Sequence, residues 1–561
     1  MGPAERATLA LMEFLLLLLL VTQLAGFWLS TPSGLVTRFA DDAYFYFKIA
    51  RGVAESGRFT FDGATTTNGF HPLWMGLLIP VFAIARNPLL ALRVAGTLNV
   101  VLLAAACFLG FRYVARRYSF LTLGICAVIV IRYFLAFAEY SMETSLLLPL
   151  CVLALMLVEP LNGSPRAAKD GGKLLALGVV MALIQLARLD AVMLNLTIVA
   201  SVCLYAAVHR RLRESLFSLW GLVAPSLIAG AAYLTLNRAV FDHFLPVSAK
   251  AKSAGAGHVN VRALHQLLPA FSWGQATSVW TLFSAMILAS LACALLLAVR
   301  ARDRNRPPAG GLRAAIASAF CLAFVAYYLV GSSWRLWGWY VYPGFLVAVF
   351  AVPEIVSAVE SRLSVPAGIS RGIARLSRLA KAAVVLGLVA VTCVAARTAR
   401  WGSWRDTDAA ANFMYQNYVL AGSLNERFSR PPTMAMGDRA GSFGYFYKGS
   451  VLQLEGLVGD YHLLDAIKHD RLAEYMSAFG VKYVVSHNAP PSGYGRWALR
   501  IPTPEFGAGP YAAVRLCEAD EVMRVSTRDG TICVWNWPSC ERQMEPSVGP
   551  RPSASAPPFR P

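Results

Sequence analysis

The sequence predicts a mainly α-helical polytopic membrane protein of about eleven transmembrane helices, followed by a C-terminal extracytoplasmic α/β domain. The 561 residues are 57% hydrophobic and 15% charged, whereas soluble domains carry about 25% charged residues. Apolar runs near the roughly 20 residues that cross a bilayer recur as far as residue 397. From about residue 398 the composition becomes that of a soluble domain. These observations exclude an ordinary soluble enzyme.

The predicted spans follow from the apolar runs. They lie at about 8–29, 91–111, 119–138, 142–158, 174–190, 191–208, 216–236, 278–299, 313–331, 338–357 and 380–397. A twelfth run, 72–85, has only about 14 residues, so we expect it to be interfacial or re-entrant. The first run lacks a clear small-residue cleavage site, so we expect an anchor helix and not a signal peptide.

The basic residues predict the orientation, because cytoplasmic loops carry an excess of Lys and Arg. With eleven spans, the basic clusters at 112–117, 166–173, 210–213, 300–313 and 362–381 all fall on one side. We therefore expect a protein of the cytoplasmic (inner) membrane with a cytoplasmic N-terminus and an extracytoplasmic C-terminal domain. The net charge of +19 reflects these loops, and no nucleic-acid partner is predicted.

The predicted domains are a transmembrane domain at 1–397, an extracytoplasmic α/β domain at 398–544 and a disordered tail rich in Pro and Ser at 545–561. Two longer outer loops, at about 30–90 and 237–277, belong to the first of these.

Within the α/β domain, the pattern predicts short strands at 433–436, 451–454 and 481–486 and a helix at 464–479. A hairpin of 522–526 and 531–537 is expected around Asp529-Gly530. Cys517, Cys533 and Cys540 allow one disulfide and leave its pairing open.

Two adjacent carboxylates, Asp41 and Asp42, lie just beyond the first span and precede an aromatic, amphipathic helix at about 43–56. Carboxylates near a bilayer are costly to desolvate, so this pair indicates a functional site. The alternative is that one of them only caps the N-terminus of the interfacial helix.

The pattern D-D-A-Y-x-Y-x-x-I-A-R, followed by T-N-G-F-H-P-L-W, resembles the first outer loop of GT-C-type glycosyltransferases. These polytopic enzymes are related to the protein mannosyltransferases and aminoarabinose transferases, a glycosyltransferase family 39-like group. Five further segments resemble the family at 141–144, 187–190, 245–250, 436–445 and 454–457. The resemblance covers nearly the whole chain except the tail, and it implies a GT-C-like fold.

The resemblance implies a membrane glycosyltransferase, of hexosyl or pentosyl type, that uses a polyprenyl-phosphate sugar. The acceptor would be a hydroxyl of a glycan, lipid or protein at the outer membrane face, and transfer would invert the anomeric centre. Asp41 matches the family's base, which takes the acceptor proton, and Asp42 would orient substrate. Cations would meet the charge that develops on the leaving phosphate. Candidates for binding donor phosphate or sugar are Glu143, Arg188, Asp190, Lys250, Lys252, Arg335, Tyr340, His71 and Asn68.

Several alternatives stay open at this point. Arg188 and Asp190 could form only an ion pair, Lys250 and Lys252 could be solvated loop charges, and His71 could satisfy a turn. No cofactor is required, although Asp41, Asp42 and Glu143 could together hold a divalent metal.

Other function classes are a flippase for a lipid-linked sugar, a solute transporter, and a non-catalytic scaffold that binds carbohydrate. A transporter predicts ionisable residues near mid-span and repeat symmetry. Here the acidic candidates cluster at the outer helix ends beside a sizeable outer domain, which favours catalysis at that face. Membrane lipids are the remaining expected partners.

Overall fold

The structure is a computed structural model of the chain. It describes residues 3–158, 171–208, 212–253, 259–267, 279–302, 311–332, 336–363, 412–487, 489–490, 492–493, 495–501, 512–527 and 530–540. The eleventh predicted span at 380–397, the predicted tail at 545–561 and Arg335 lie outside these residues.

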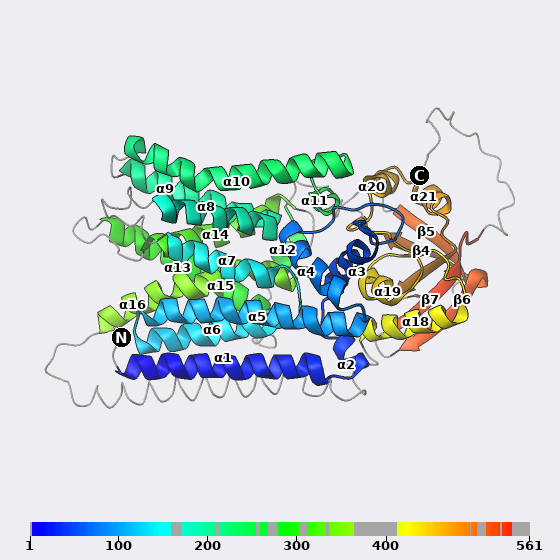
Figure 1. Ribbon diagram of the computed structural model, residues 1–561, viewed down its shortest axis with the longest axis horizontal. Coiled ribbons are helices and arrows are strands. Elements are labelled where there is room, and N and C mark those ends of the chain that lie inside the picture. The colour runs from blue at the N-terminus through cyan, green and yellow to red at the C-terminus, as the bar shows by residue number, and fades with distance from the viewer. Residues whose placement is uncertain are drawn as a thin grey trace.

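Long apolar helices form a bundle at one end of the molecule (Figure 1). The bundle helices are α1 (Pro3–Leu29), α5 (Pro88–Ala115), α6 (Phe120–Ala138), α7 (Thr144–Leu157), α8 (Gly171–Ala187), α9 (Val192–Val208), α10 (Leu212–Phe241), α13 (Val279–Arg302), α14 (Gly311–Val330), α15 (Pro343–Phe350) and α16 (Val352–Leu363). Each of the first ten predicted spans coincides with one of these helices or, at 338–357, with the run from the short 3₁₀ helix η6 (Gly338–Val341) into α16.

The chain is a multi-pass membrane protein. Within the described residues, seven segments are long and apolar enough to cross a bilayer. They are Leu9–Leu29, Pro88–Ala115, Phe120–Ala138, Leu219–Phe241, Val279–Arg300, Gly311–Val330 and Gly338–Arg362. Thr144–Leu157, Gly172–Ala187 and Leu189–Leu204 are shorter apolar helices, as is α4 (Pro72–Ile84), the predicted short run. The N-terminus of α1 and the C-terminal domain lie at opposite ends of the bundle (Figure 1).

Five short helices occupy the boundary between the bundle and the C-terminal domain. They are α2 (Pro32–Val36), α3 (Asp41–Ser56), α4, α11 (Val247–Ser253) and α12 (Val261–Leu267). The predicted amphipathic helix is α3, which begins two residues earlier than expected and so carries Asp41 and Asp42 in its first turn. The alternative that either aspartate caps this helix is wrong, because its N-cap is Ala40 and no side chain caps it.

The C-terminal domain contains a five-stranded sheet of order β2-β1-β3-β7-β6. Strands β1 (Met434–Met436), β2 (Val451–Gln453) and β3 (Tyr483–His487) are parallel, whereas β6 (Glu521–Thr527) and β7 (Gly530–Asn536) form the predicted hairpin. All five of these strands were expected. The predicted helix 464–479 is instead two helices, α20 (Tyr461–Lys468) and α21 (Leu472–Ala478). Asp470 between them has a left-handed backbone (φ 54°), which interrupts a helix.

Two features of this domain, a hairpin and a pair of helices, were not expected from the sequence, and the structure also gives the disulfide pairing that the sequence left open. A separate hairpin joins β4 (Arg496–Ile501) to β5 (Ala512–Cys517). Two helices, α18 (Phe413–Arg427) and α19 (Ala440–Phe446), lie on the side that faces the bundle (Figure 1). The disulfide joins Cys517 to Cys540 and leaves Cys533 as a buried thiol.

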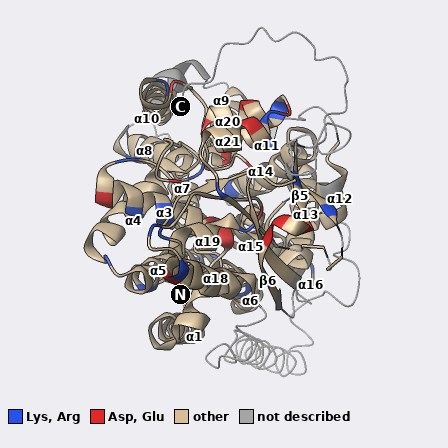
Figure 2. Ribbon diagram, turned by 90° about the vertical axis from the view of Figure 1, so that its right-hand side faces the viewer, with Lys and Arg blue, Asp and Glu red and all other residues tan. Residues whose placement is uncertain are grey.

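The C-terminal domain packs closely against the first outer loop. A Cβ at Gly444 of α19 would lie 2.4 Å from the Phe61 ring. Arg51 of α3 lies over the ring of Tyr445 with its guanidinium 4.4 Å from the centroid, and the Ser450 hydroxyl donates to the Asp62 carbonyl oxygen (2.6 Å). Figure 2 views this end of the molecule, with an acidic ribbon segment beside α19. The C-terminal domain and the first outer loop are therefore packed against each other.

Candidate active site

The carboxylate of Asp41 is hydrogen-bonded to the C-terminal domain. It accepts hydrogen bonds from the backbone N–H of Gly441 (2.8 Å), the N–H of Ser442 (2.8 Å) and the Ser442 hydroxyl (2.7 Å). Both N–H groups belong to the first turn of α19, where backbone donors lack partners within their own helix. Burial raises the pKa of Asp41, and the bonds from Ser442 and Gly441 oppose that rise.

Asp42 lies on the walls of two cavities. The inner cavity, of about 50 Å³, extends from Asp42 to Arg188 and Lys252. The outer cavity, of about 610 Å³, extends from Asp42 to Trp337 and the start of α18. Burial raises the pKa of Asp42 to about 7, against the opposing effect of the Lys252 ammonium. The Asp42 carboxyl group can therefore take up or release a proton near neutral pH, and it can do so with a group in either cavity.

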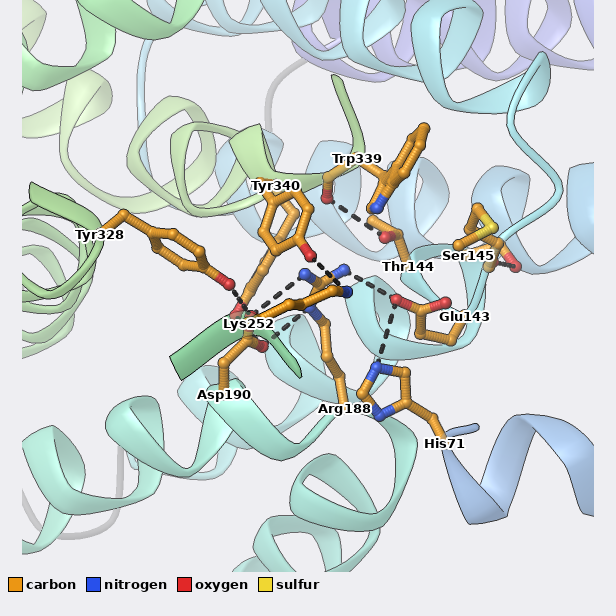
Figure 3. Close-up of polar contacts among 12 residues, drawn as sticks. His71, Glu143, Thr144, Ser145, Arg188, Asp190, Lys252, Tyr328, Trp339 and Tyr340 are labelled. Carbon is orange, nitrogen blue, oxygen red and sulfur yellow. Dashed lines mark hydrogen bonds and ion pairs between the residues drawn. The ribbon is translucent and has the colours of Figure 1, made fainter. Parts of the chain in front are cut away.

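Arg188 is the centre of a buried ion cluster in the inner cavity (Figure 3). Its Nε and Nη2 donate to the two carboxylate oxygens of Asp190 (2.7 and 3.1 Å), and its Nη1 donates to Oε1 of Glu143 (2.7 Å). The Tyr328 hydroxyl also donates to Asp190 (2.7 Å). The predicted ion pair between Arg188 and Asp190 is thus present. Together with Glu143 and Tyr328, this pair connects the ends of α7, α8 and α14.

Lys252 of α11 reaches the same cluster from the middle outer loop (Figure 3). Its ammonium donates to the Tyr340 hydroxyl (3.0 Å), and the ring of Tyr340 lies 4.4 Å from the Arg188 guanidinium. Burial alone would lower the pKa of Lys252, but Tyr340 and Asp42 hold it above its usual value. The inner cavity therefore holds a charged ammonium beside Asp42.

His71 faces Glu143, with 3.7 Å between His71 Nε2 and Glu143 Oε1. Burial lowers the pKa of His71 to about 4, so the ring is neutral at pH 7. Within the described residues, neither Nδ1 of His71 nor Oε2 of Glu143 has a hydrogen-bond partner, although both atoms are buried. Buried polar atoms are normally paired, so these two atoms can bind a water or another small polar group in the inner cavity.

The remaining predicted candidates lie in different places. Asn68 is buried and holds the middle loop, because its Oδ1 accepts from the Val247 N–H (2.8 Å) and its Nδ2 donates to Leu245. It is therefore a positioning residue for α11. Lys250 is exposed and lies over the Tyr461 ring, 5.2 Å from the centroid, away from the residues that line both cavities.

The three carboxylates proposed as metal ligands do not converge. Both oxygens of Asp41 accept from α19, and Oε1 of Glu143 accepts from Arg188. In the part of the chain that the structure describes, the acidic, His and Cys groups close enough to share a metal are Cys517, Asp520 and Cys540, but the two cysteines form a disulfide.

Sequence reasoning missed residues that line the outer cavity, among them Glu139, Asp438, Glu455 and Trp280. Trp337 and Trp339 also line this cavity, but tryptophans near helix ends are common at membrane interfaces, so they do not by themselves mark a binding site. Asp438 and Glu455 lie in two segments that resembled the family, 436–445 and 454–457, which was a usable signal. Glu139 is isolated in sequence, and only the fold brings it to the same cavity.

Comparison with solved structures identifies the fold. The chain aligns with ArnT from Cupriavidus metallidurans bound to undecaprenyl phosphate at a TM-score of 0.53 and 11% identity, over 93% of this chain and 97% of that chain. The apo form of the same protein aligns at a TM-score of 0.51 and 10% identity, over the same shares. ArnT is an aminoarabinose transferase of the GT-C class. This chain has a GT-C fold.

The GT-C fold confirms the predicted resemblance and the predicted fold class. The archaeal oligosaccharyltransferase AglB from Archaeoglobus fulgidus aligns at a TM-score of 0.44 and 13% identity, over 86% of this chain and 69% of that chain. No protein-family model matches the sequence, and no curated protein does either. At identities of 10–11%, the similarity to ArnT establishes the fold alone. Evidence for the activity comes from the residues that line the two cavities.

Proposed function

We propose that the chain is a membrane glycosyltransferase that moves a sugar from a polyprenyl-phosphate donor to an acceptor hydroxyl. The observation that carries this proposal is the position of Asp42 on the walls of both cavities, between the ammonium of Lys252 and the wide outer space. The GT-C fold supports it, and the similar ArnT structure is bound to undecaprenyl phosphate. The outer face of the cytoplasmic membrane is the proposed location.

In the proposed reaction the donor phosphate lies in the inner cavity. The ammonium of Lys252 and the hydroxyl of Tyr340 bind the phosphate oxygens, and Arg188 is held beside them by Glu143 and Asp190. Charge-assisted hydrogen bonds of this kind are about twice as strong as neutral ones. The unpaired atoms of His71 and Glu143 bind hydroxyls of the donor sugar.

The acceptor hydroxyl enters from the outer cavity. Its oxygen attacks the anomeric carbon, its proton passes to the carboxylate of Asp42, and the bond from the anomeric carbon to the phosphate oxygen breaks. The bonding electrons stay on the leaving phosphate, where Lys252 compensates the charge. Because this is a single displacement, the configuration at the anomeric carbon inverts. This proposal reverses the roles that the resemblance implies for the two aspartates. Asp42 is the proposed base, whereas Asp41, whose carboxylate is bonded to Gly441 and Ser442, positions Asp42 by fixing the start of α3 against α19.

The test uses the purified full-length protein in lipid nanodiscs with radiolabelled polyprenyl-phosphate sugars that differ in the head sugar. We expect release of polyprenyl phosphate with labelled sugar on an acceptor or on water. Asp42→Asn should abolish this release, whereas Asp465→Asn, an exposed aspartate on α20, should leave it unchanged. Full turnover by Asp42→Asn, or movement of the intact donor across a membrane without cleavage, would contradict the proposal.

A further inference from the structure

The described wall of the outer cavity carries more carboxyl groups than guanidinium groups. Its described lining contains two guanidinium groups, Arg38 and Arg439, and a larger set of carboxylates. These are Asp41, Asp42, Glu139, Asp438 and Glu455. Glu139 is exposed and the side chain of Asp438 is 71% exposed, whereas Glu455 is buried. Carboxylates therefore extend from the entrance to the depth of the cavity.

Both guanidinium groups contact groups of the protein itself. Arg38 donates from Nε to the Ser30 hydroxyl (3.3 Å) and lies over the Phe27 ring. Arg439 lies over the Phe413 ring, 4.5 Å from the centroid, and 4.0 Å from Asp438. An anionic ligand in this cavity would meet the carboxylates of Glu139, Asp438 and Glu455 in the described wall, and like charge is a strong means of excluding a wrong partner.

Aromatic rings form another part of the wall. The rings of Trp337 and Trp339 are parallel within 2°, with centroids 5.4 Å apart, and Tyr140 meets the Trp339 ring edge-on at 5.6 Å. Flat aromatic rings contact the C–H faces of sugar rings, whereas carboxylate oxygens accept hydrogen bonds from sugar hydroxyls. The cavity combines these two surfaces, and its volume of about 610 Å³ is that of a ligand-binding pocket.

We propose that the outer cavity is the acceptor site and that it binds the end of an uncharged glycan chain while excluding anionic acceptors. The inference rests on the proposed glycosyltransferase function and narrows its acceptor from glycan, lipid or protein to one class. A glycan end stacked on Trp337 and Trp339 lies beside Asp42, because Trp339 and Asp42 line both cavities. Its terminal hydroxyl then reaches the donor in the inner cavity.

The experiment measures binding of fluorescently labelled tetrasaccharides to the full-length protein in nanodiscs. The panel contains neutral hexose and pentose tetramers of several linkages, with tetragalacturonate and a phosphorylated tetramer as the anionic members. We expect binding of neutral members only, weakened at least about tenfold in Trp337→Ala and in Glu455→Lys. The matched controls are Trp220→Ala, which changes an exposed tryptophan of α10, and Glu474→Lys, which changes an exposed glutamate of α21.

Binding of undecaprenyl phosphate by the same preparation, measured by native mass spectrometry, separates the two proposals. A protein that binds neutral tetramers and no undecaprenyl phosphate contradicts the proposed donor and leaves this inference standing. A protein that binds undecaprenyl phosphate but prefers tetragalacturonate or the phosphorylated tetramer overturns this inference alone. Binding of no panel member, or equal binding by Trp337→Ala, overturns it as well.

Discussion

The carboxylate of Asp41 accepts hydrogen bonds from the backbone N–H and the hydroxyl of Ser442, a residue 401 positions later in the chain. This contact fixes the first turn of α3 against the first turn of α19. It leaves the adjacent carboxylate, Asp42, as the member of the pair that lines both cavities. The C-terminal domain is thereby part of the proposed site, because it determines where Asp42 lies.

The close approach of α19 to α3 predicts a large effect of Gly441→Ala. A Cβ there would lie 2.2 Å from the Asp41 carbonyl oxygen and 2.8 Å from its carboxylate. The helices must separate, and a shift of about 1 Å at a reacting group can reduce turnover roughly 100-fold. Donor cleavage assays and limited proteolysis of the outer domain measure the effect. Gly422→Ala on α18 is the control, because its added Cβ meets no atom within 4 Å among the described residues; equal activity of both variants would contradict the prediction.

The elevated pKa of Asp42 predicts the pH dependence of transfer. Because the proposed base acts as the carboxylate, and burial raises its pKa to about 7, kcat/KM should rise about tenfold per pH unit below pH 7 and level off above it. Asp42→Asn should remove this dependence together with nearly all activity. Asp465→Asn should keep the wild-type profile. A wild-type profile that is flat from pH 5 to 8 would assign the proton transfer to another group.

Two lysines separated by one residue on α11 should differ in donor binding. Lys252 lies in the inner cavity and bonds to Tyr340, whereas Lys250 is exposed over Tyr461. Hydrogen bonds to charged groups contribute about 1.5–3 kcal/mol, so Lys252→Ala should weaken undecaprenyl phosphate binding by roughly 10- to 100-fold. Lys250→Ala should change it by less than about fivefold, because an exposed charge contributes at most about 1 kcal/mol. Titration in nanodiscs compares the two; a larger loss in Lys250→Ala would show that α11 binds the donor through its other face.

Local signals were sufficient to predict the transmembrane helices and the main sheet. The length of the apolar runs predicted the bundle helices. The short runs at 451–454 and 481–486 predicted strands, because segments of this length between turn residues are too short for helices. The break at Asp470 was not predicted, because the helical spacing of apolar residues runs through 464–479 and does not reveal the left-handed backbone of one polar residue within it. The hairpin of β4 and β5 was missed for a similar reason, since its strands alternate weakly.

The candidate site was predictable only where its residues are adjacent in sequence. Asp41 and Asp42 stood out as a pair, but their different surroundings depend on Ser442 and α19. Likewise, Arg188 and Asp190 were considered as a pair from the sequence, but only the packing of α7 against α8 adds Glu143 to their cluster. The carboxyl groups of the outer cavity come from the first outer loop, the end of α6 and two segments of the C-terminal domain, so no single local pattern marks the whole set.

The buried cluster around Arg188 predicts a stability effect that differs from its effect on activity. Arg188→Ala leaves the carboxylates of Glu143 and Asp190 buried without their cation, and breaking such a pair typically costs about 3–5 kcal/mol. Thermal unfolding of the protein in detergent should show a clearly lower midpoint. The exposed pair of Arg471 and Asp465 provides the control, because Arg471→Ala should cost less than about 1 kcal/mol.

A triple variant separates the two roles of this cluster. Arg188→Met combined with Glu143→Gln and Asp190→Asn removes the charges together, so most of the lost stability should return. Donor cleavage should stay low, because the triple variant has neither the cation beside the leaving phosphate nor the carboxylate of Glu143 that faces His71. Restored stability with restored cleavage would show that the cluster only holds α7 and α8 together. Restored stability without cleavage is the expected result, and it would show that the charged groups of this cluster take part in binding the donor.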